Sequence, residues 1–482
     1  MRRHIVRAAV FLVVFVVWAD TPTTQDKARM VDALLTSYHD AGIFNGTALV
    51  SDGGHVVFKK GYGLADFEWK IPNTPDTKFR IGSITKQFTA TVIVQLVEEG
   101  KLSLDATLSS VLPYYRKDTG SKITVHQLLT HTSGIPSYTG LPNFMRDVSR
   151  NPYGVREFVE KYCSGDLEFE PGSRFLYNNS GYFLLGAIIE AVTNKPYAQV
   201  LRERVLEPLG MAASGYDLSG PILEKRARGY ENGPAGVRNA DYLDMLLPYA
   251  AGSLYSTVED LYIWDQALYG ERVLPSKAKE LMFTPGLGNY GFGWLVQKRS
   301  IGVDKAERLT IGHGGGINGF NTQITRVPED RHLVVLFNNT GGTNLGAMTD
   351  GILDILYGRT PPSARRPVST LMYDTIHKSG VKAAVDQYRE IRNANTSTYD
   401  VSVPQLNRLA IELLNEKRAG DAIEIAKLSV EVVPKNPNLL STLARAYREA
   451  GETNLAIQTY ESVLQLDANN RNAIERLKEL KP

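Results

Sequence analysis

The β-rich segments of this chain fall into two groups, which a long and mostly helical middle separates. The first group comprises residues 47–50 and 55–58, which flank an Asp-Gly-Gly turn and predict a β-hairpin. The second group comprises three short runs separated by turns that contain Gly or Pro, at residues 309–311, 321–324 and 333–337. Strands from both ends with helices between them predict an α+β fold, in which the late strands complete the sheet.

The segments between and around these strands favour helices. We expect helices over residues 27–41, 84–99, 182–193 and 345–357, the last of which closes the domain. The chain has 482 residues, too many for one ordinary core, so a domain over 27–360 should be followed by a further unit.

The sequence after residue 360 changes character. Prolines within residues 361–367 predict a linker, because proline blocks continuation of a helix. Beyond it, residues 368–482 contain pairs that recur after 34 residues: Leu409-Ala410 and Leu443-Ala444, Ala422-Ile423 and Ala456-Ile457, Pro434 and Ala468. This is the period of a tetratricopeptide helix pair, and residues 380–388 hold a weaker partial copy.

This tail therefore predicts a small all-α, tetratricopeptide-like domain. The alternative is two amphipathic helix pairs that share their spacing by chance. Stacked helix pairs present a concave face, so a protein or peptide partner is expected there. Equally, the tail could dock onto the preceding domain or stabilise it instead of binding a separate partner.

The N-terminus has the pattern of a secretory signal peptide over residues 1–19. Three arginines and a histidine within the first seven residues precede the apolar run 8–18, and Ala19 offers a small residue for cleavage. We expect an exported protein, periplasmic or extracellular. The alternative is an uncleaved N-terminal anchor, and no other membrane contact is expected, because no other segment approaches ~20 apolar residues.

Charge and cysteine content exclude other classes of function. The formal net charge of +2 is close to neutral, so the chain lacks the strong positive charge of a nucleic-acid-binding protein, and no nucleic-acid partner is expected. The one cysteine, Cys163, cannot form an intramolecular disulfide, and no Cys/His cluster has zinc spacing, so no metal or cofactor is expected. A nucleophilic role for Cys163 would need a nearby base, and a structural thiol is the favoured interpretation.

Ser83 and Lys86 form the first candidate catalytic pair. A serine hydroxyl needs a base within hydrogen-bond reach, and residues three apart on a helix share a face. Burial would lower the pKa of the lysine and make it a usable base. The same spacing occurs at 276/279 and 379/382, but only Ser83 follows a glycine and precedes an apolar helix, whose first turn favours negative charge.

Two further stretches accompany this pair. Residues 177–182 read Tyr-Asn-Asn-Ser-Gly-Tyr, and residues 312–316 read Gly-His-Gly-Gly-Gly directly after a predicted strand. Together with Ser-x-x-Lys they resemble the serine β-lactamase family, particularly class C enzymes and their relatives among D-alanyl-D-alanine carboxypeptidases and family VIII esterases. The resemblance includes non-catalytic phrases, at residues 128–134, 207–211, 251–257 and 290–294.

The resemblance implies a fold and a role for each matching residue. The fold would be an antiparallel sheet flanked by helices, with a helical subdomain. Ser83 would attack the acyl carbon, with Lys86 as its base, and Tyr177 would pass the proton to the leaving group. Asn179 would hold Lys86 and a substrate amide, and the backbone N–H groups of Ser83 and Gly316 would form the oxyanion hole.

The third of these motifs, Gly-His-Gly-Gly-Gly at residues 312–316, departs from the β-lactamase pattern, because His313 stands where a lysine is usual. Several peptidase and esterase relatives use histidine there, so a catalytic role for His313 is retained. A histidine is largely neutral above pH 6.5, which argues against strong binding of penicillin-type carboxylates. For His131, in the landmark phrase at 128–134, packing is the favoured role.

The leading function is therefore an acyl-serine hydrolase that cleaves a small-molecule or peptide substrate at a peptide, amide or ester bond. A true β-lactamase is the first alternative. A catalytically silent penicillin-binding or scaffold protein that acts through its tail is the second. Specificity should depend on loops around the cleft, for which residues 139–153 and 214–247 are the candidates.

Overall fold

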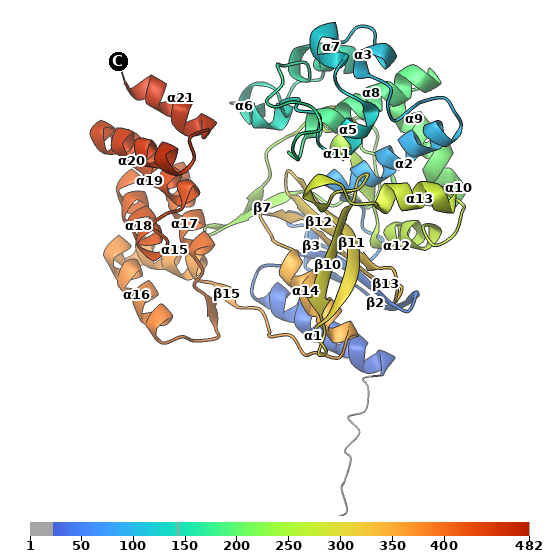
Figure 1. The fold of residues 1–482 in the computed structure, drawn as a ribbon. Coiled ribbons are helices and arrows are strands. Elements are labelled where there is room, and N and C mark those ends of the chain that lie inside the picture. The colour runs from blue at the N-terminus through green and yellow to red at the C-terminus, as the bar shows by residue number, and fades with distance from the viewer. Residues whose placement is uncertain (1–22, 142–143, 482) are drawn as a thin grey trace, which may run out of the picture.

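The computed structural model describes residues 23–141 and 144–481 (Figure 1). The signal peptide or anchor predicted over residues 1–19 lies outside the described residues. Within those two ranges, the helices are all too short or too polar to cross a bilayer.

A six-stranded antiparallel sheet forms the centre of the first domain. Its order is β10-β11-β12-β13-β1-β2, so the late strands pair with the N-terminal hairpin, as the sequence predicts. Leu49 on β1, for example, lies opposite Val335 on β13. The strands are β1 (Gly46–Asp52), β2 (His55–Tyr62), β10 (Leu295–Ile301), β11 (Ala306–Ile317), β12 (Phe320–Val327) and β13 (His332–Asn338).

Helices cover both faces of this sheet, which is why β1 and β13 are buried along almost their whole length. Ala48 and Val50 pack with α1 (Thr24–Asp40) and α14 (Gly346–Leu356). Leu49, one residue out of phase, packs on the other face with α2 (Thr85–Glu98), α8 (Asn179–Thr193) and α12 (Val258–Ala267).

Two of the predicted helices begin three residues earlier than expected, for local reasons. The Thr23 side chain accepts a hydrogen bond from the Asp26 backbone and Asp26 reciprocates, so this capping box starts α1 three residues before residue 27. The Asn178 side chain accepts a hydrogen bond from the Gly181 backbone N–H and so caps α8, which starts at Asn179 rather than at residue 182.

The middle of the chain forms a helical subdomain above the sheet, together with short strands. Its helices include α3 (Leu108–Val111), α4 (Lys117–Gly120), α5 (Val125–Leu129), η2 (Tyr138–Gly140), α6 (Phe144–Asp147), α7 (Val155–Tyr162), α9 (Tyr197–Leu201), η3 (Arg202–Leu206), α10 (Glu207–Leu209), α11 (Tyr249–Gly252), α13 (Ser276–Phe283) and η4 (Leu287–Asn289). The short strands are β3 (Leu64–Asp66), β4 (Ile71–Pro72), β5 (Phe79–Arg80), β6 (Gly215–Tyr216), β7 (Tyr230–Gly233), β8 (Gly236–Asn239), β9 (Leu254–Ser256) and β14 (Thr340–Gly341).

The C-terminal helices form a separate stack beside the first domain (Figure 1, orange to red). They are α15 (Val368–Ser379), α16 (Val381–Asn393), α17 (Val403–Asn415), α18 (Ala419–Val432), α19 (Pro437–Glu449), α20 (Thr453–Leu466) and α21 (Arg471–Leu480). The starts of α17 and α19, and those of α18 and α20, are each 34 residues apart. The predicted linker ends in a two-residue strand, β15 (Arg366–Pro367), which pairs with β16 (Tyr399–Asp400).

Candidate active site

Ser83 lies in a short helical turn that leads into α2. The turn is η1 (Gly82–Ile84), and Gly82 has a φ of +52°, a conformation that favours glycine. The hydroxyl of Thr322 on β12 donates to the carbonyl oxygen of Ile81 at 2.8 Å and ties the turn to the sheet. The nucleophile predicted from the sequence therefore has a fixed position at the start of a helix.

Lys86 is fully buried and lies against Ser83. Its Nζ is 3.1 Å from Ser83 Oγ, 2.9 Å from Asn179 Oδ1 and 2.8 Å from the carbonyl oxygen of Ala251. Burial holds the pKa of Lys86 well below its ordinary value. A neutral amine has two hydrogens and one lone pair. In the neutral form that the lowered pKa favours, Asn179 Oδ1 and the Ala251 carbonyl oxygen, which can only accept, would take the two hydrogens and leave the lone pair for Ser83.

The segment at 177–179 completes the lysine site. Asn179 Nδ2 donates to Thr139 Oγ1 at 3.1 Å, which orients Oδ1 towards Lys86. The Tyr177 ring centroid is 4.9 Å from Lys86 Nζ. The Tyr177 side chain is 37% exposed, yet desolvation by its surroundings raises the pKa of the phenol. Tyr177 therefore keeps its proton while it remains open to the cleft.

The end of β11 lies beside the Ser83 turn. Its partner β10 begins at Leu295, opposite Gly312, so residues 313–317 have a ladder partner on β12 only. A Cβ on Gly82 would lie 3.0 Å from the Gly316 nitrogen, and a Cβ on Gly315 would collide with the carbonyl oxygen of Ile81. The glycines thus allow two backbones to touch, which places the Gly316 N–H next to Ser83.

His313 is buried at 4% exposure behind Tyr177, with both ring nitrogens engaged. Nδ1 is 2.6 Å from the carbonyl oxygen of Gly314, which can only accept, so Nδ1 carries the proton. Nε2 must then accept from the Tyr290 hydroxyl at 2.9 Å. Burial, and secondly the nearby Lys86 amine, lower the pKa of His313 to about 4. His313 is thus a neutral side chain and supplies no cation for a substrate.

This burial predicts a pH dependence of stability. Folded His313 stays neutral down to about pH 4, whereas the unfolded chain takes up this proton below about pH 6.5. The unfolded state binds more protons between these values, so the free energy of unfolding should fall by up to about 3 kcal/mol as the pH falls through this window. Thermal unfolding at pH 7 and pH 4.5 checks this; His313→Asn should show a smaller loss, and an equal loss would contradict the assignment.

His131 occupies the centre of an aromatic cluster and is 1% exposed. Its ring centroid lies 4.3 Å from that of Tyr177, 5.1 Å from that of Tyr182 and 4.6 Å from that of Tyr290. Its Nδ1 accepts from the backbone N–H of Asn178 at 3.1 Å. The structure thus gives His131 the packing role that the sequence favours, directly behind Tyr177.

Sequence reasoning missed three contributors to this site. Thr139 and the Ala251 carbonyl orient Asn179 and Lys86, and Tyr290 fixes His313. Ala251 and Tyr290 open two of the phrases that carry the resemblance, but nothing in the phrases indicates these contacts. Among the described residues no three potential metal ligands cluster, and Cys163 is buried away from the cleft lining.

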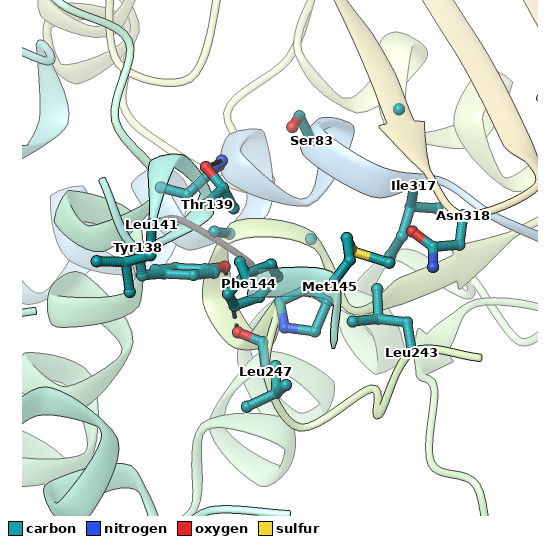
Figure 2. Close-up of a pocket in the computed structure, with 15 residues that line it drawn as sticks. Ser83, Tyr138, Thr139, Leu141, Phe144, Met145, Leu243, Leu247, Ile317 and Asn318 are labelled. Atoms are coloured by element: carbon teal, nitrogen blue, oxygen red, sulfur yellow. Dashed lines mark hydrogen bonds between the residues drawn. The ribbon is translucent and has the colours of Figure 1, made fainter. Parts of the chain in front are cut away.

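A cavity of about 410 Å³ opens in front of Ser83 (Figure 2). The described residues that line it carry no charged side chain, and they include Tyr138, Thr139, Leu141, Phe144, Met145, Leu243, Leu247, Ile317 and Asn318. Residues from 139–153 and from 214–247 form its walls, as predicted, and their role in specificity stays a prediction. An apolar cavity next to the nucleophile suits an uncharged acyl group.

Comparisons with known proteins point to one family. The family model described as Beta-lactamase matches residues 28–358 and leaves the C-terminal helices outside the match. Penicillin-binding protein 4* of Bacillus subtilis is 28% identical over 65% of this chain and 72% of its own length.

Solved structures give the same result. A penicillin-binding protein from Bacillus halodurans aligns with a TM-score of 0.56 and 30% identity, over 64% of this chain and 96% of that one. D-amino acid amidase from Ochrobactrum anthropi, in complex with D-phenylalanine, aligns with a TM-score of 0.57 and 28% identity, over 69% of this chain and 96% of that one.

Proposed function

The chain belongs to the beta-lactamase family of serine hydrolases, and on this premise we propose that it cleaves an amide, peptide or ester bond through an acyl-enzyme on Ser83. The observation that carries the proposal is the buried Lys86 amine, 3.1 Å from Ser83 Oγ, with two further contacts to oxygens that can only accept. A neutral amine at this distance can take the serine proton as a new bond forms.

The proposed reaction has two halves. Ser83 Oγ bonds to the substrate carbonyl carbon, its proton passes to Lys86 Nζ, and the N–H groups of Ser83 and Gly316 stabilise the oxyanion. The bond to the leaving group then breaks, and Tyr177 donates a proton to the departing nitrogen or oxygen, which Lys86 replaces. In the second half, water attacks the ester carbon and its proton passes through Tyr177 and Lys86 to Ser83 Oγ. The ester C–O bond breaks, and the acid and free Ser83 are released.

The neutral state of His313 favours amides and esters over β-lactams as the proposed substrates. It is neutral and engaged at both nitrogens, so the third motif offers no fixed charge to a carboxylate. The similarity to D-amino acid amidase points in the same direction. His313 accordingly acts in the proposal as a positioning residue behind Tyr177 and not as a group that touches substrate.

We expect short acyl esters or D-Ala-D-Ala peptides to be cleaved with a kcat/KM at least about tenfold above that for nitrocefin, a difference of about 1.4 kcal/mol in transition-state binding. Steady-state kinetics on all three, with fluorophosphonate labelling of Ser83 as the count of active enzyme, measures it. Fast nitrocefin turnover would support a true β-lactamase instead. Absence of Ser83-dependent label with fluorophosphonate and fluorescent penicillin would support a silent binding protein.

For the rest of the chain we propose a tetratricopeptide-like domain over 368–482 and export directed by residues 1–19. The 34-residue offsets between α17 and α19 and between α18 and α20 support the first part. The basic and apolar N-terminal sequence supports the second, and mass spectrometry of the mature protein would test it.

A further inference from the structure

A second cavity, of about 760 Å³, lies beside the active site and is bounded by both parts of the chain. Ser137, Gly140 and Tyr177 line it on the catalytic side, whereas Asn469, Arg471 and Ile474 line it from the tail. Its size falls in the range of about 300–1,000 Å³ that is typical of small-ligand sites.

The turn η2 separates this cavity from the one in front of Ser83. Tyr138 and Thr139 line the first cavity, and their neighbours Ser137 and Gly140 line the second. The catalytic groups lie at the boundary, because Ser83 faces the first cavity and Tyr177 the second. The two cavities therefore lie on either side of η2, one next to Ser83 and the other next to Tyr177.

Two attachments hold the tail in this position. At its far end, Arg471 forms an ion pair with Glu168, whose backbone N–H donates to the carbonyl oxygen of Gly134 at 2.8 Å. Near its middle, Glu412 on α17 is paired with Arg238 on β8 at 2.9 Å, and the Glu412 side chain is only 9% exposed. The Glu412 carboxylate is shielded from water whereas the Arg238 side chain is 55% exposed, so solvent screens this pair only in part.

Building on the proposed function, we propose that the second cavity is the leaving-group subsite and that the tail forms its outer wall. The first reason is Tyr177, the proposed proton donor to the leaving atom, which lines this cavity. The second reason is the contrast in lining: the acyl cavity is uncharged, whereas Glu168, Arg174 and Arg471 line the second one. Charged walls suit the polar amine or alcohol half of a short peptide or ester.

This arrangement sets an upper limit to the size of the leaving group. Ile474 on α21 is partly buried at the wall, and a larger side chain there would narrow the subsite without touching Ser83 or Lys86. Removing the Arg471 side chain would widen the subsite and break the ion pair with Glu168. The two changes should therefore act in opposite directions on bulky leaving groups.

The test uses the full chain and two butyrate esters, p-nitrophenyl and 4-methylumbelliferyl, whose leaving groups have one and two rings. For Ile474→Trp we expect the ratio of kcat/KM for the two-ring ester to that for the one-ring ester to fall about tenfold. For Arg471→Ala we expect the ratio to rise at least about twofold. Glu475→Trp, on the same helix but outside the cavity lining, is the matched control and should leave the ratio unchanged.

Fluorophosphonate labelling separates the two proposals. It reports on Ser83 but not on the leaving-group subsite, because its leaving group is a small fluoride ion. If the wild type shows no Ser83-dependent label, the proposed function fails. If labelling is normal but neither Ile474→Trp nor Arg471→Ala changes the ratio, the subsite proposal is overturned and the function stands. Thermal unfolding of each variant confirms that a changed ratio comes from folded enzyme.

Discussion

Replacing Ser83 by alanine is expected to lower hydrolysis by about 10⁴-fold or more, because the acyl-enzyme can no longer form. The expected loss is large because Lys86 and the oxyanion donors contribute only when Ser83 Oγ bonds to the substrate carbonyl carbon. Turnover of p-nitrophenyl butyrate measures the loss. Intact-protein mass spectrometry should show one added group per wild-type chain after fluorophosphonate treatment, and none on the variant.

Ser276→Ala is the matched control for this experiment. Ser276 has the same three-residue spacing to a lysine, Lys279, but its hydroxyl donates to Glu271 and the Lys279 amine donates to carbonyl oxygens of residues 268 and 270. The control should retain full activity and labelling. Residual labelling of Ser83→Ala, or loss of labelling in Ser276→Ala, would contradict the assignment of the nucleophile.

Replacing Lys86 by methionine is expected to lower kcat/KM by about 10²–10⁴-fold, the usual contribution of general acid–base catalysis. Methionine matches the length of the buried stem but cannot take the Ser83 proton. It also leaves Asn179 Oδ1 and the Ala251 carbonyl oxygen without the donor that now serves them, at a cost of about 1–3 kcal/mol each if water does not replace it.

Lys382→Met is the control, because Lys382 has the 379/382 spacing but lies exposed in the tail. It should leave both activity and melting temperature unchanged. A folded Lys86→Met variant with activity within tenfold of wild type would remove Lys86 from the role of base. Measuring kcat/KM beside thermal unfolding distinguishes loss of the base from loss of the fold.

Five of the six strands in the sheet could be predicted because each has a local signal, whereas β10 was missed. The Asp-Gly-Gly turn and the apolar runs around it are short-range patterns, and the late strands were available to pair with the free edge of β1. Helix starts at 24 and 179 were missed because they depend on the capping side chains of Thr23 and Asn178, which come before the apolar periodicity begins.

The sequence by itself determined the candidate nucleophile and its neighbour, since Ser83 and Lys86 are three residues apart on one helical turn and Gly82 permits the bend before them. Only the tertiary structure decided that Lys86 is fully buried with a lowered pKa, that His313 is engaged at both ring nitrogens, and that the tail reaches the Tyr177 side of the cleft. The physical reason is the distance along the sequence between the residues involved. Burial, tautomer and a shared cavity all depend on residues such as 86, 179 and 251, or 177 and 471, which only the folded chain brings together.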